Sequence, residues 1–121
     1  ILYLGVSNTW GFVPGAFDPK TLYMKRYSIL ERWTGLLRGI MGKNYLIIEK
    51  GLNGRITNVE YSGLSRRSGT FYILPCLYSY SPLDLVILNI GRNDIKVIFD
   101  RSMMEISEMV AEIIDLARST S

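Results

Sequence analysis

The stretch from Pro82 to Ile90 constrains the fold of this chain most. It reads Pro-Leu-Asp-Leu-Val-Ile-Leu-Asn-Ile, with a nearly unbroken apolar centre from Leu85 onward. A strand that is apolar on both faces needs cover on both faces, as in parallel sheets that lie under helices. The run is also far shorter than the roughly 18 residues of a membrane-spanning helix, so no membrane span is expected. The stretch therefore predicts a buried strand of an α/β sheet.

Two segments have the pattern of amphipathic helices that pack on such a sheet. Each begins with a capping box, in which two side chains bond free backbone N–H groups of the first turn. The boxes are formed by Ser28 with Glu31 and by Ser102 with Glu105. Apolar residues then recur at helical spacing, and Gly42 follows the first set where a C-cap is expected. These patterns predict helices over 28–41 and 102–119.

The remaining segments complete an α/β order of elements. They are expected to be strands at 1–6 and 45–48, an ordered loop at 10–27, a polar surface segment at 57–70 and a short helix around Cys76. The order strand, helix, strand, irregular segment, strand, helix is typical of the α/β class, because parallel strands need crossover connections. The length predicts a single domain over 1–121.

Composition excludes several kinds of site and partner. The 121 residues contain no histidine, so they cannot complete a Ser-His-Asp or Cys-His apparatus or supply a histidine metal ligand. The single cysteine, Cys76, excludes an internal disulfide and a multi-cysteine zinc site, and it is expected to be a buried apolar residue. The net charge of +3 comes from scattered residues, so no nucleic-acid partner is implied.

Three polar loops are expected to meet at one edge of the sheet, because ligands of open α/β sheets bind at the carboxyl ends of the strands. The loops contain Ser7 with Asn8, Asn53 with Gly54, and Asn93 with Asp94. Each alone is a common turn or cap pattern. Together they supply a hydroxyl, a backbone N–H beside a glycine and a side-chain amide. Acyl transfer requires these parts, a nucleophile and donors for the oxyanion.

These loops lie in three sequence blocks that resemble those of the SGNH, or GDSL-type, hydrolases, and in particular their arylesterase and acyltransferase-like branch. The blocks are Gly5-Val6-Ser7-Asn8-Thr9-Trp10-Gly11, Glu49-Lys50-Gly51-Leu52-Asn53-Gly54-Arg55, and Pro82-Leu83-Asp84-Leu85-Val86-Ile87 leading into Gly91-Arg92-Asn93-Asp94. They stand in the family's order, and the resemblance covers nearly the whole chain.

The resemblance implies a role for one residue in each block. Ser7 resembles the nucleophile, whose own N–H also lines the oxyanion hole. Gly54 resembles the backbone donor of the second block and Asn93 the side-chain donor of the third. The family implies a flavodoxin-like three-layer α/β/α fold and the hydrolysis or transfer of small acyl groups through an acyl-enzyme. A small ester or acylated substrate is thus expected, with no metal or organic cofactor.

Five nearby residues are candidates for substrate contact. Trp10, Phe12 and Tyr23 could shape an acyl or leaving-group pocket, and packing in the core or loop is the alternative for each. Asn8 and Arg55 are candidates because they adjoin Ser7 and Gly54, and an exposed structural role is the alternative for Arg55. The pair at 66–67 is expected to be solvated charge.

Two departures from the family pattern affect the expected activity. Val6 stands where the family usually has Asp, which removes a polar group that helps to hold the nucleophile loop. The family's Asp-x-x-His block, expected about 60 to 90 residues downstream, is absent from these residues. Asp94 is expected to cap its loop and Asp100 to lie in solvent, so neither replaces that block. Loss of a triad member costs several orders of magnitude in turnover.

Two hypotheses of function follow. In the first, the chain is the amino-terminal portion of a serine ester hydrolase and is inactive alone. In the second, it is a degenerate hydrolase fold kept as a non-catalytic binding or assembly module, as Val6 and the absent histidine favour. A nucleotide-binding domain is disfavoured, because no Gly-x-Gly-x-x-Gly or phosphate loop follows the first strand.

The third predicted strand is expected to lie at an edge of a sheet ordered 2-1-3, although its apolar centre suits a sheet interior. An exposed strand edge favours pairing with another strand. We expect a longer natural protein, truncated here at its C-terminus, to supply that strand. A homo-oligomer formed through the exposed third strand is the alternative. The sequence gives no indication of the cellular compartment.

Overall fold

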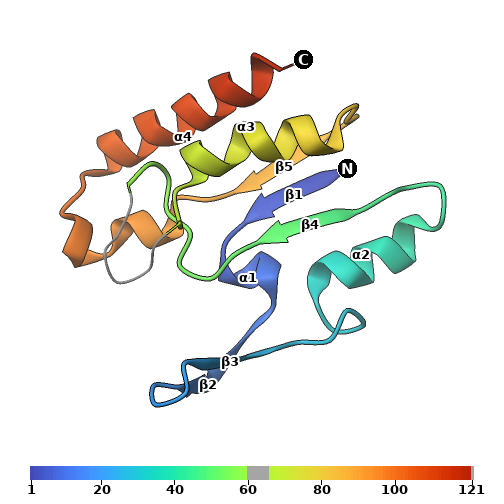
Figure 1. Ribbon diagram of the computed structural model, residues 1–121, viewed down its shortest axis with the longest axis horizontal. Coiled ribbons are helices and arrows are strands. Elements are labelled where there is room, and N and C mark those ends of the chain that lie inside the picture. Colours follow the sequence, from blue (N-terminus) through green and yellow to red (C-terminus); the bar gives the residue numbers. More distant parts are fainter. Residues whose placement is uncertain (60–65, 121) are drawn as a thin grey trace.

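β1 (Leu2–Gly5) is the central strand of a three-stranded parallel sheet (Figure 1). In this computed structural model, which describes residues 1–59 and 66–120, β4 (Ile48–Gly51) and β5 (Val86–Asn89) pair with β1 on either side. The strand order β4-β1-β5 is the 2-1-3 order predicted from the sequence. The α/β class and the crossover topology are therefore confirmed.

The side chains of β1 alternate between two covered faces of the sheet. Leu2 and Leu4 are fully buried in a cluster with residues of α3 (Gly69–Tyr80) and α4 (Met103–Arg118). Tyr3 points to the other face, where its ring meets Trp33 of α2 (Trp33–Met41) edge-on, with the centroids 4.9 Å apart. Figure 1 shows α3 and α4 on one side of the sheet and α2 on the other, so three layers are present.

The apolar cluster between the sheet and α3 includes Cys76, which is 3% exposed. Burial raises the pKa of this thiol above its ordinary value. Cys76 is therefore the buried apolar residue predicted from the sequence.

α4 confirms its predicted start, but α2 does not. The capping box of Ser102 and Glu105 is complete, with both reciprocal hydrogen bonds present. α2 spans Trp33–Met41 and begins five residues later than the other predicted box, at Ser28. Glu31 still accepts a hydrogen bond from the Ser28 N–H at 3.1 Å, but this closes a separate turn. The turn cannot continue into the helix, because Arg32 has an extended backbone with ψ of 140°.

The expected irregular loop at 10–27 contains regular structure instead. α1 (Ser7–Trp10) is a single helical turn, and β2 (Phe12–Asp18) and β3 (Tyr23–Arg26) form an antiparallel hairpin. The prediction failed because a Pro-Gly pair interrupts β2. The hairpin accommodates the pair by a register irregularity between the paired positions Phe12 and Phe17, and peripheral strands tolerate such interruptions.

Smaller corrections concern the middle of the chain. β4 begins three residues later than the strand predicted at 45–48, and α3 runs over the whole of 69–80. Thr57 and Ser68 are buried, so the ends of the segment 57–70 are not a polar surface, and its residues 60–65 lie outside the described residues. Two 3₁₀ turns follow β5, η1 (Arg92–Ile95) and η2 (Val97–Phe99).

β5 lies at the sheet edge, as predicted. Within residues 1–59 and 66–120, β5 pairs with β1 alone. Apolar side chains exposed by one third or more occur in the segments that flank it, namely Leu85, Ile95, Val97, Ile98, Met103 and Met104. Over the same residues, no helix has the length and apolar character needed to cross a bilayer.

Candidate active site

The turn from β1 into α1 places Ser7 at the carboxyl edge of the sheet. Two glycines make this placement sterically feasible. A Cβ on Gly5 would overlap the Thr9 side chain, and a Cβ on Gly51 would lie 2.7 Å from the Cα of Trp10. α1 therefore packs directly on the ends of β1 and β4. The backbone carbonyl of Val6 accepts hydrogen bonds from the N–H groups of Thr9 and Trp10, so backbone bonds close the turn whatever the Val6 side chain.

A cavity of about 550 Å³ lies at this edge. The structure brings together there the three residues expected from the sequence, Ser7, Gly54 and Asn93. The other lining residues are Phe12, Phe17, Leu22, Met24, Asn53, Arg67 and Lys96. The volume is in the range of small-molecule sites. A hydroxyl, a glycine backbone and an amide thus share one small-molecule-sized space, as the three-loop prediction required.

Backbone N–H groups of two loops remain available at the cavity. Ser7 is the first residue of α1, and the N–H of such a residue has no partner within its helix. Gly54 has a φ of 72°, a conformation that favours glycine. Among the described residues, neither the Ser7 nor the Gly54 N–H donates to a backbone carbonyl.

The Asn93 amide is fixed between the second and third loops. Its Nδ2 donates a 2.9 Å hydrogen bond to the backbone carbonyl of Arg55. An amide nitrogen has two donor hydrogens, so one N–H of Asn93 remains for a ligand. A positive φ of 101° at Gly91 lets the chain turn from β5 into η1, the 3₁₀ turn that carries Asn93.

A buried ion pair locks the same two loops together. Asp94 is fully buried and accepts hydrogen bonds from the Thr57 N–H at 3.0 Å and the Thr57 hydroxyl at 2.6 Å. Its partner is Arg101, at 2.8 Å. Asp94 therefore does more than cap its own loop, which was the role expected from the sequence. The carboxylate instead joins the loop after β5 to the loop after β4, while Asp100 is exposed as predicted.

Solved structures of known proteins share the fold of this chain. No protein-family model and no curated protein matches the sequence. An aryl esterase of M. smegmatis matches at 35% identity and a TM-score of 0.87, over 95% of this chain and 52% of that one. A carbohydrate acetylesterase from Sinorhizobium meliloti matches at 36% identity and 0.85, over 95% and 52%. These neighbours are SGNH hydrolases, and this chain is similar to them.

The match covers only part of those proteins. A carbohydrate acetylesterase family member from Sinorhizobium meliloti also matches at 28% identity and a TM-score of 0.81, over 97% of this chain and 52% of that one. The chain thus spans about half the length of the SGNH structures that it matches. These neighbours support an esterase-type hydrolase fold.

Arg55 of the second SGNH block is buried, not exposed as the alternative reading expected. It is 3% exposed, and its guanidinium donates to the backbone carbonyls of Gly5 and Lys50 and lies over the Tyr72 ring. Desolvation by burial lowers the pKa of Arg55 to about 10. Arg55 does not line the cavity. It braces the ends of β1 and β4, a role for which the sequence carries no local signal.

Of the remaining candidates for substrate contact, Phe12 lines the cavity, whereas Asn8, Trp10 and Tyr23 are not among the described residues that line it. Asn8 and Tyr23 are exposed. The Trp10 carbonyl accepts a 2.5 Å hydrogen bond from Arg26 Nε, and the Arg26 guanidinium lies over its ring. Trp10 therefore anchors the hairpin to α1.

Sequence reasoning missed the apolar wall that the hairpin adds. Phe17, Leu22 and Met24 line the cavity, and Met24 Sδ accepts a 3.2 Å hydrogen bond from the Asn53 amide. It also missed Arg67 and Lys96, because Arg67 was expected to be solvated. No signal for this wall was available once 10–27 was predicted to be irregular.

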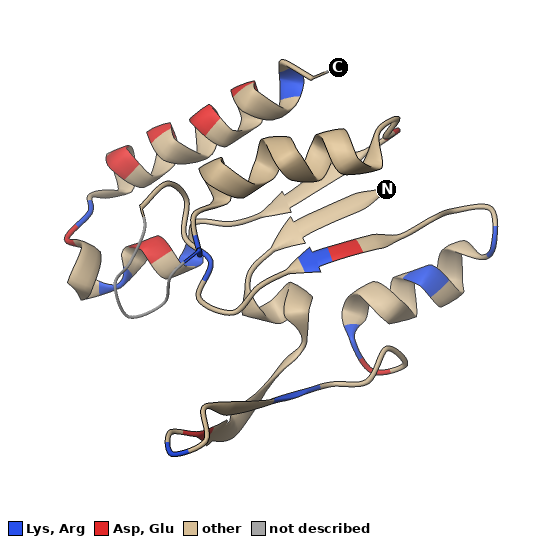
Figure 2. Cartoon of the chain, viewed as in Figure 1, with Lys and Arg blue, Asp and Glu red and all other residues tan. Residues whose placement is uncertain are grey.

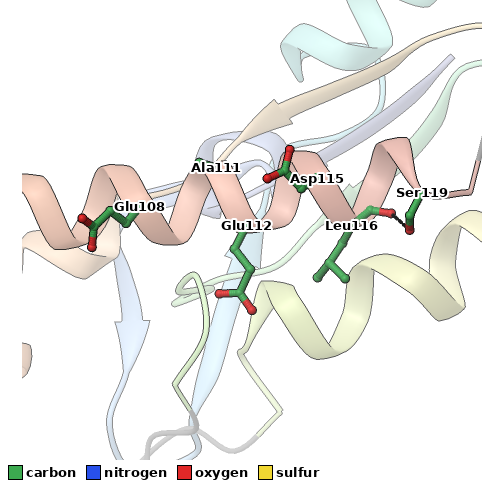
Figure 3. A pocket seen from close by; sticks show the side chains of 6 residues that line it. All are labelled: Glu108, Ala111, Glu112, Asp115, Leu116 and Ser119. Atoms are coloured by element: carbon green, nitrogen blue, oxygen red, sulfur yellow. Dashed lines mark hydrogen bonds between the residues drawn. The ribbon is translucent and has the colours of Figure 1, made fainter.

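A second hollow of about 530 Å³ lies along α4 and is unrelated to the SGNH loops. Its lining residues are Glu108, Ala111, Glu112, Asp115, Leu116 and Ser119 (Figure 3). All belong to one helix and its C-cap, so the hollow is a shallow part of the acidic helix surface seen in Figure 2. The Ser119 hydroxyl donates to the Leu116 carbonyl at 2.7 Å. Across the described residues, no three His, Cys, Asp or Glu side chains are placed to hold a metal ion.

Proposed function

We propose that this chain carries the nucleophile and oxyanion donors of a serine ester hydrolase that works through an acyl-enzyme. The observation that carries the proposal is the shared cavity of Ser7, Gly54 and Asn93. The similarity to aryl esterases and carbohydrate acetylesterases supports carboxylic esters as the substrate class.

In the proposed reaction the Ser7 hydroxyl attacks the ester carbonyl carbon and loses its proton to a general base. The negative charge that develops on the carbonyl oxygen is stabilised by the N–H groups of Ser7 and Gly54 and by the free N–H of Asn93. The alcohol leaves with the proton, and water or another alcohol then releases the acyl group. The hydrogen bond from Asn93 to Arg55 and the Asp94–Thr57 contacts hold these donors in place before substrate binds.

The base must come from outside these residues. None of the 121 residues is a histidine, and Asp94 is committed to Arg101. We propose that an Asp-x-x-His segment about 60 to 90 residues downstream supplies it, since such a sheet needs two further strand and helix units. The 121 residues alone should then hydrolyse a short-chain aryl ester at a rate close to background.

A second candidate is a hydrolase fold kept for binding or assembly. The absence of histidine and the apolar Val6 before the nucleophile favour it. In that case, a strand from another protein or from a second copy of this chain would pair along the exposed edge of β5.

Hydrolysis of 4-nitrophenyl acetate by the complete protein separates these proposals. The esterase proposal predicts turnover that falls by several orders of magnitude in Ser7→Ala, because the nucleophile is lost. Ser79→Ala, an exposed serine of α3, is the control and should keep the wild-type rate. Absence of turnover in a complete protein that lacks Asp-x-x-His would favour the binding module. Robust turnover by the 121 residues alone would show that a base within them had been overlooked.

A further inference from the structure

The cavity around Ser7 has an unbalanced charge. Two of its lining residues, Arg67 and Lys96, are basic, and none of the described lining residues is acidic. Asp94 lies two residues before Lys96 but is fully buried and paired with Arg101 at 2.8 Å. The carboxylate closest in sequence therefore cannot neutralise this charge, so the space favours an anion.

Arg67 also has a buried donor with no partner among the described residues. Its Nε is inaccessible to solvent and forms no hydrogen bond with residues 1–59 or 66–120, although the residue itself is only half-buried. The backbone is fixed independently, because the Arg67 carbonyl accepts a 3.1 Å hydrogen bond from the Ile56 N–H. A buried donor left unpaired is costly, and an acceptor on a bound molecule would remove that cost once a shift of the Arg67 side chain opens Nε to the cavity.

The rest of the wall is apolar. Phe12, Phe17, Leu22 and Met24 of the hairpin face the same cavity as the two cations. Apolar walls exclude water and strengthen a charge interaction beside them. An aromatic or short aliphatic portion of a substrate would contact the hairpin while a charged group reaches the cations.

We propose that the cavity binds esters that carry a carboxylate or another anionic group, and that Arg67 and Lys96 recognise that group. The inference rests on the proposed function, because it assigns a substrate class to the same site. The anion can belong to the acyl part or to the alcohol part of the ester. In both cases it forms a charge-assisted hydrogen bond with the Arg67 guanidinium, and Lys96 adds a second, more solvated contact.

Binding of uncleaved amide analogues to the complete protein tests the proposal without requiring catalysis. 4-Acetamidobenzoate carries its carboxylate on the leaving-group side, and N-phenylsuccinamate carries it on the acyl side. Each is compared by calorimetry with its neutral carboxamide. We expect at least one carboxylate to bind about tenfold more tightly than its carboxamide, since hydrogen bonds to charged groups contribute that much. The analogue that shows the preference identifies the side of the anion.

Variants test the assigned residues. Arg67→Gln should reduce the preference for the carboxylate over the carboxamide about tenfold. Lys96→Gln should reduce it about threefold, as for an exposed ion pair. Arg67→Lys should restore part of it, because it keeps the charge without the planar fork. Lys43→Gln removes the same charge from an exposed loop outside the cavity, so this control should leave the preference for the carboxylate unchanged. Equal binding of carboxylate and carboxamide, or a preference that survives both cavity variants, would overturn the proposal.

Hydrolysis of the matching esters, 4-acetoxybenzoate and phenyl hydrogen succinate, separates this inference from the proposed function. Charge-selective binding without hydrolysis of either ester would leave the anion site standing and refute the esterase. Hydrolysis of 4-nitrophenyl acetate without charge-selective binding would refute the anion site and leave the esterase proposal standing.

Discussion

The Asn93 amide nitrogen lies 2.9 Å from the backbone carbonyl oxygen of Arg55, the residue that follows Gly54. This hydrogen bond connects a side chain of the third loop to the backbone of the second. The same contact orients the amide and leaves its other N–H for a ligand. Two of the three proposed oxyanion donors are thus held relative to each other by a single bond.

Removal of the Asn93 amide should therefore slow the chemical step. We predict that Asn93→Ala lowers kcat of the complete protein for 4-nitrophenyl acetate about 100-fold or more, the usual cost of losing one oxyanion donor. KM should change much less, because the donor acts mainly in the transition state. Asn44→Ala, in an exposed loop, is the control. An unchanged kcat in Asn93→Ala would refute the role assigned to this amide.

The buried ion pair should be a major contributor to stability. Asp94→Asn removes the charge that faces Arg101 and weakens the contacts with Thr57. Breaking one partner of a buried pair costs about 3 to 5 kcal/mol, and we expect a loss of that order in the free energy of unfolding measured with urea.

Asp100 provides a matched control for that substitution. It is an exposed aspartate with φ of 44°, a conformation that asparagine also tolerates. Asp100→Asn should change the free energy of unfolding by less than about 0.5 kcal/mol. Equal effects of the two substitutions would show that burial and pairing of Asp94 add nothing to stability.

Gly51 should not tolerate a side chain. A methyl group there would overlap the backbone of Thr9 and Trp10, which cannot move without displacing the helical turn that begins at Ser7. We predict that Gly51→Ala lowers the free energy of unfolding by about 1 to 3 kcal/mol or more, as overpacking does. Gly39 of α2 has open space around it, so Gly39→Ala should raise stability by about 0.5 to 1 kcal/mol. If both variants were stabilised, the close approach of α1 to β4 would be wrong.

The ion pair between Glu49 and Arg32 should make stability depend on pH. Burial alone would raise the pKa of Glu49, but hydrogen bonds from Arg32 and Thr34 and attraction to Arg32 outweigh it, so the pKa is lowered. A lowered folded-state pKa means that ionised Glu49 stabilises the fold above about pH 4.5 and that this stabilisation is lost as the pH falls through the folded pKa.

Glu49→Gln should therefore be less stable than the wild type by about 1 to 3 kcal/mol at pH 7, with a smaller deficit at pH 3. Urea unfolding at the two pH values measures both differences. Glu112→Gln, an exposed site on α4, should show neither effect. A deficit that stays constant with pH would contradict the charge-based explanation.

The sequence predicted those parts of the fold that depend on local patterns. The apolar run before Gly91 predicted the strand β5 correctly but its burial wrongly, because residues 86–88 are only half-buried and Asn89 is exposed at the sheet edge. The Ser102–Glu105 box predicted the start of α4, and the order of elements predicted the β4-β1-β5 sheet. The rule that ligands gather at the carboxyl ends of strands then predicted that Ser7, Gly54 and Asn93 would share one cavity.

The parts that the sequence did not predict depend on contacts between distant residues. Arg55 is buried because carbonyl oxygens of Gly5 and Lys50 accept its hydrogen bonds, and one of these residues is 50 positions away. Asp94 is buried because Thr57, 37 positions away, donates to it. The hairpin forms although a Pro-Gly pair interrupts β2, because a register irregularity accommodates the pair. Such pairings leave no periodic signal.

Covalent labelling of the complete protein with a fluorophosphonate reagent, mapped by mass spectrometry, tests the central proposal most directly. The reagent reacts with a serine hydroxyl that is activated and surrounded by oxyanion donors. We predict a single adduct on Ser7 that disappears in Ser7→Ala and persists in Ser79→Ala. An adduct on another residue, or labelling that survives Ser7→Ala, would contradict the account.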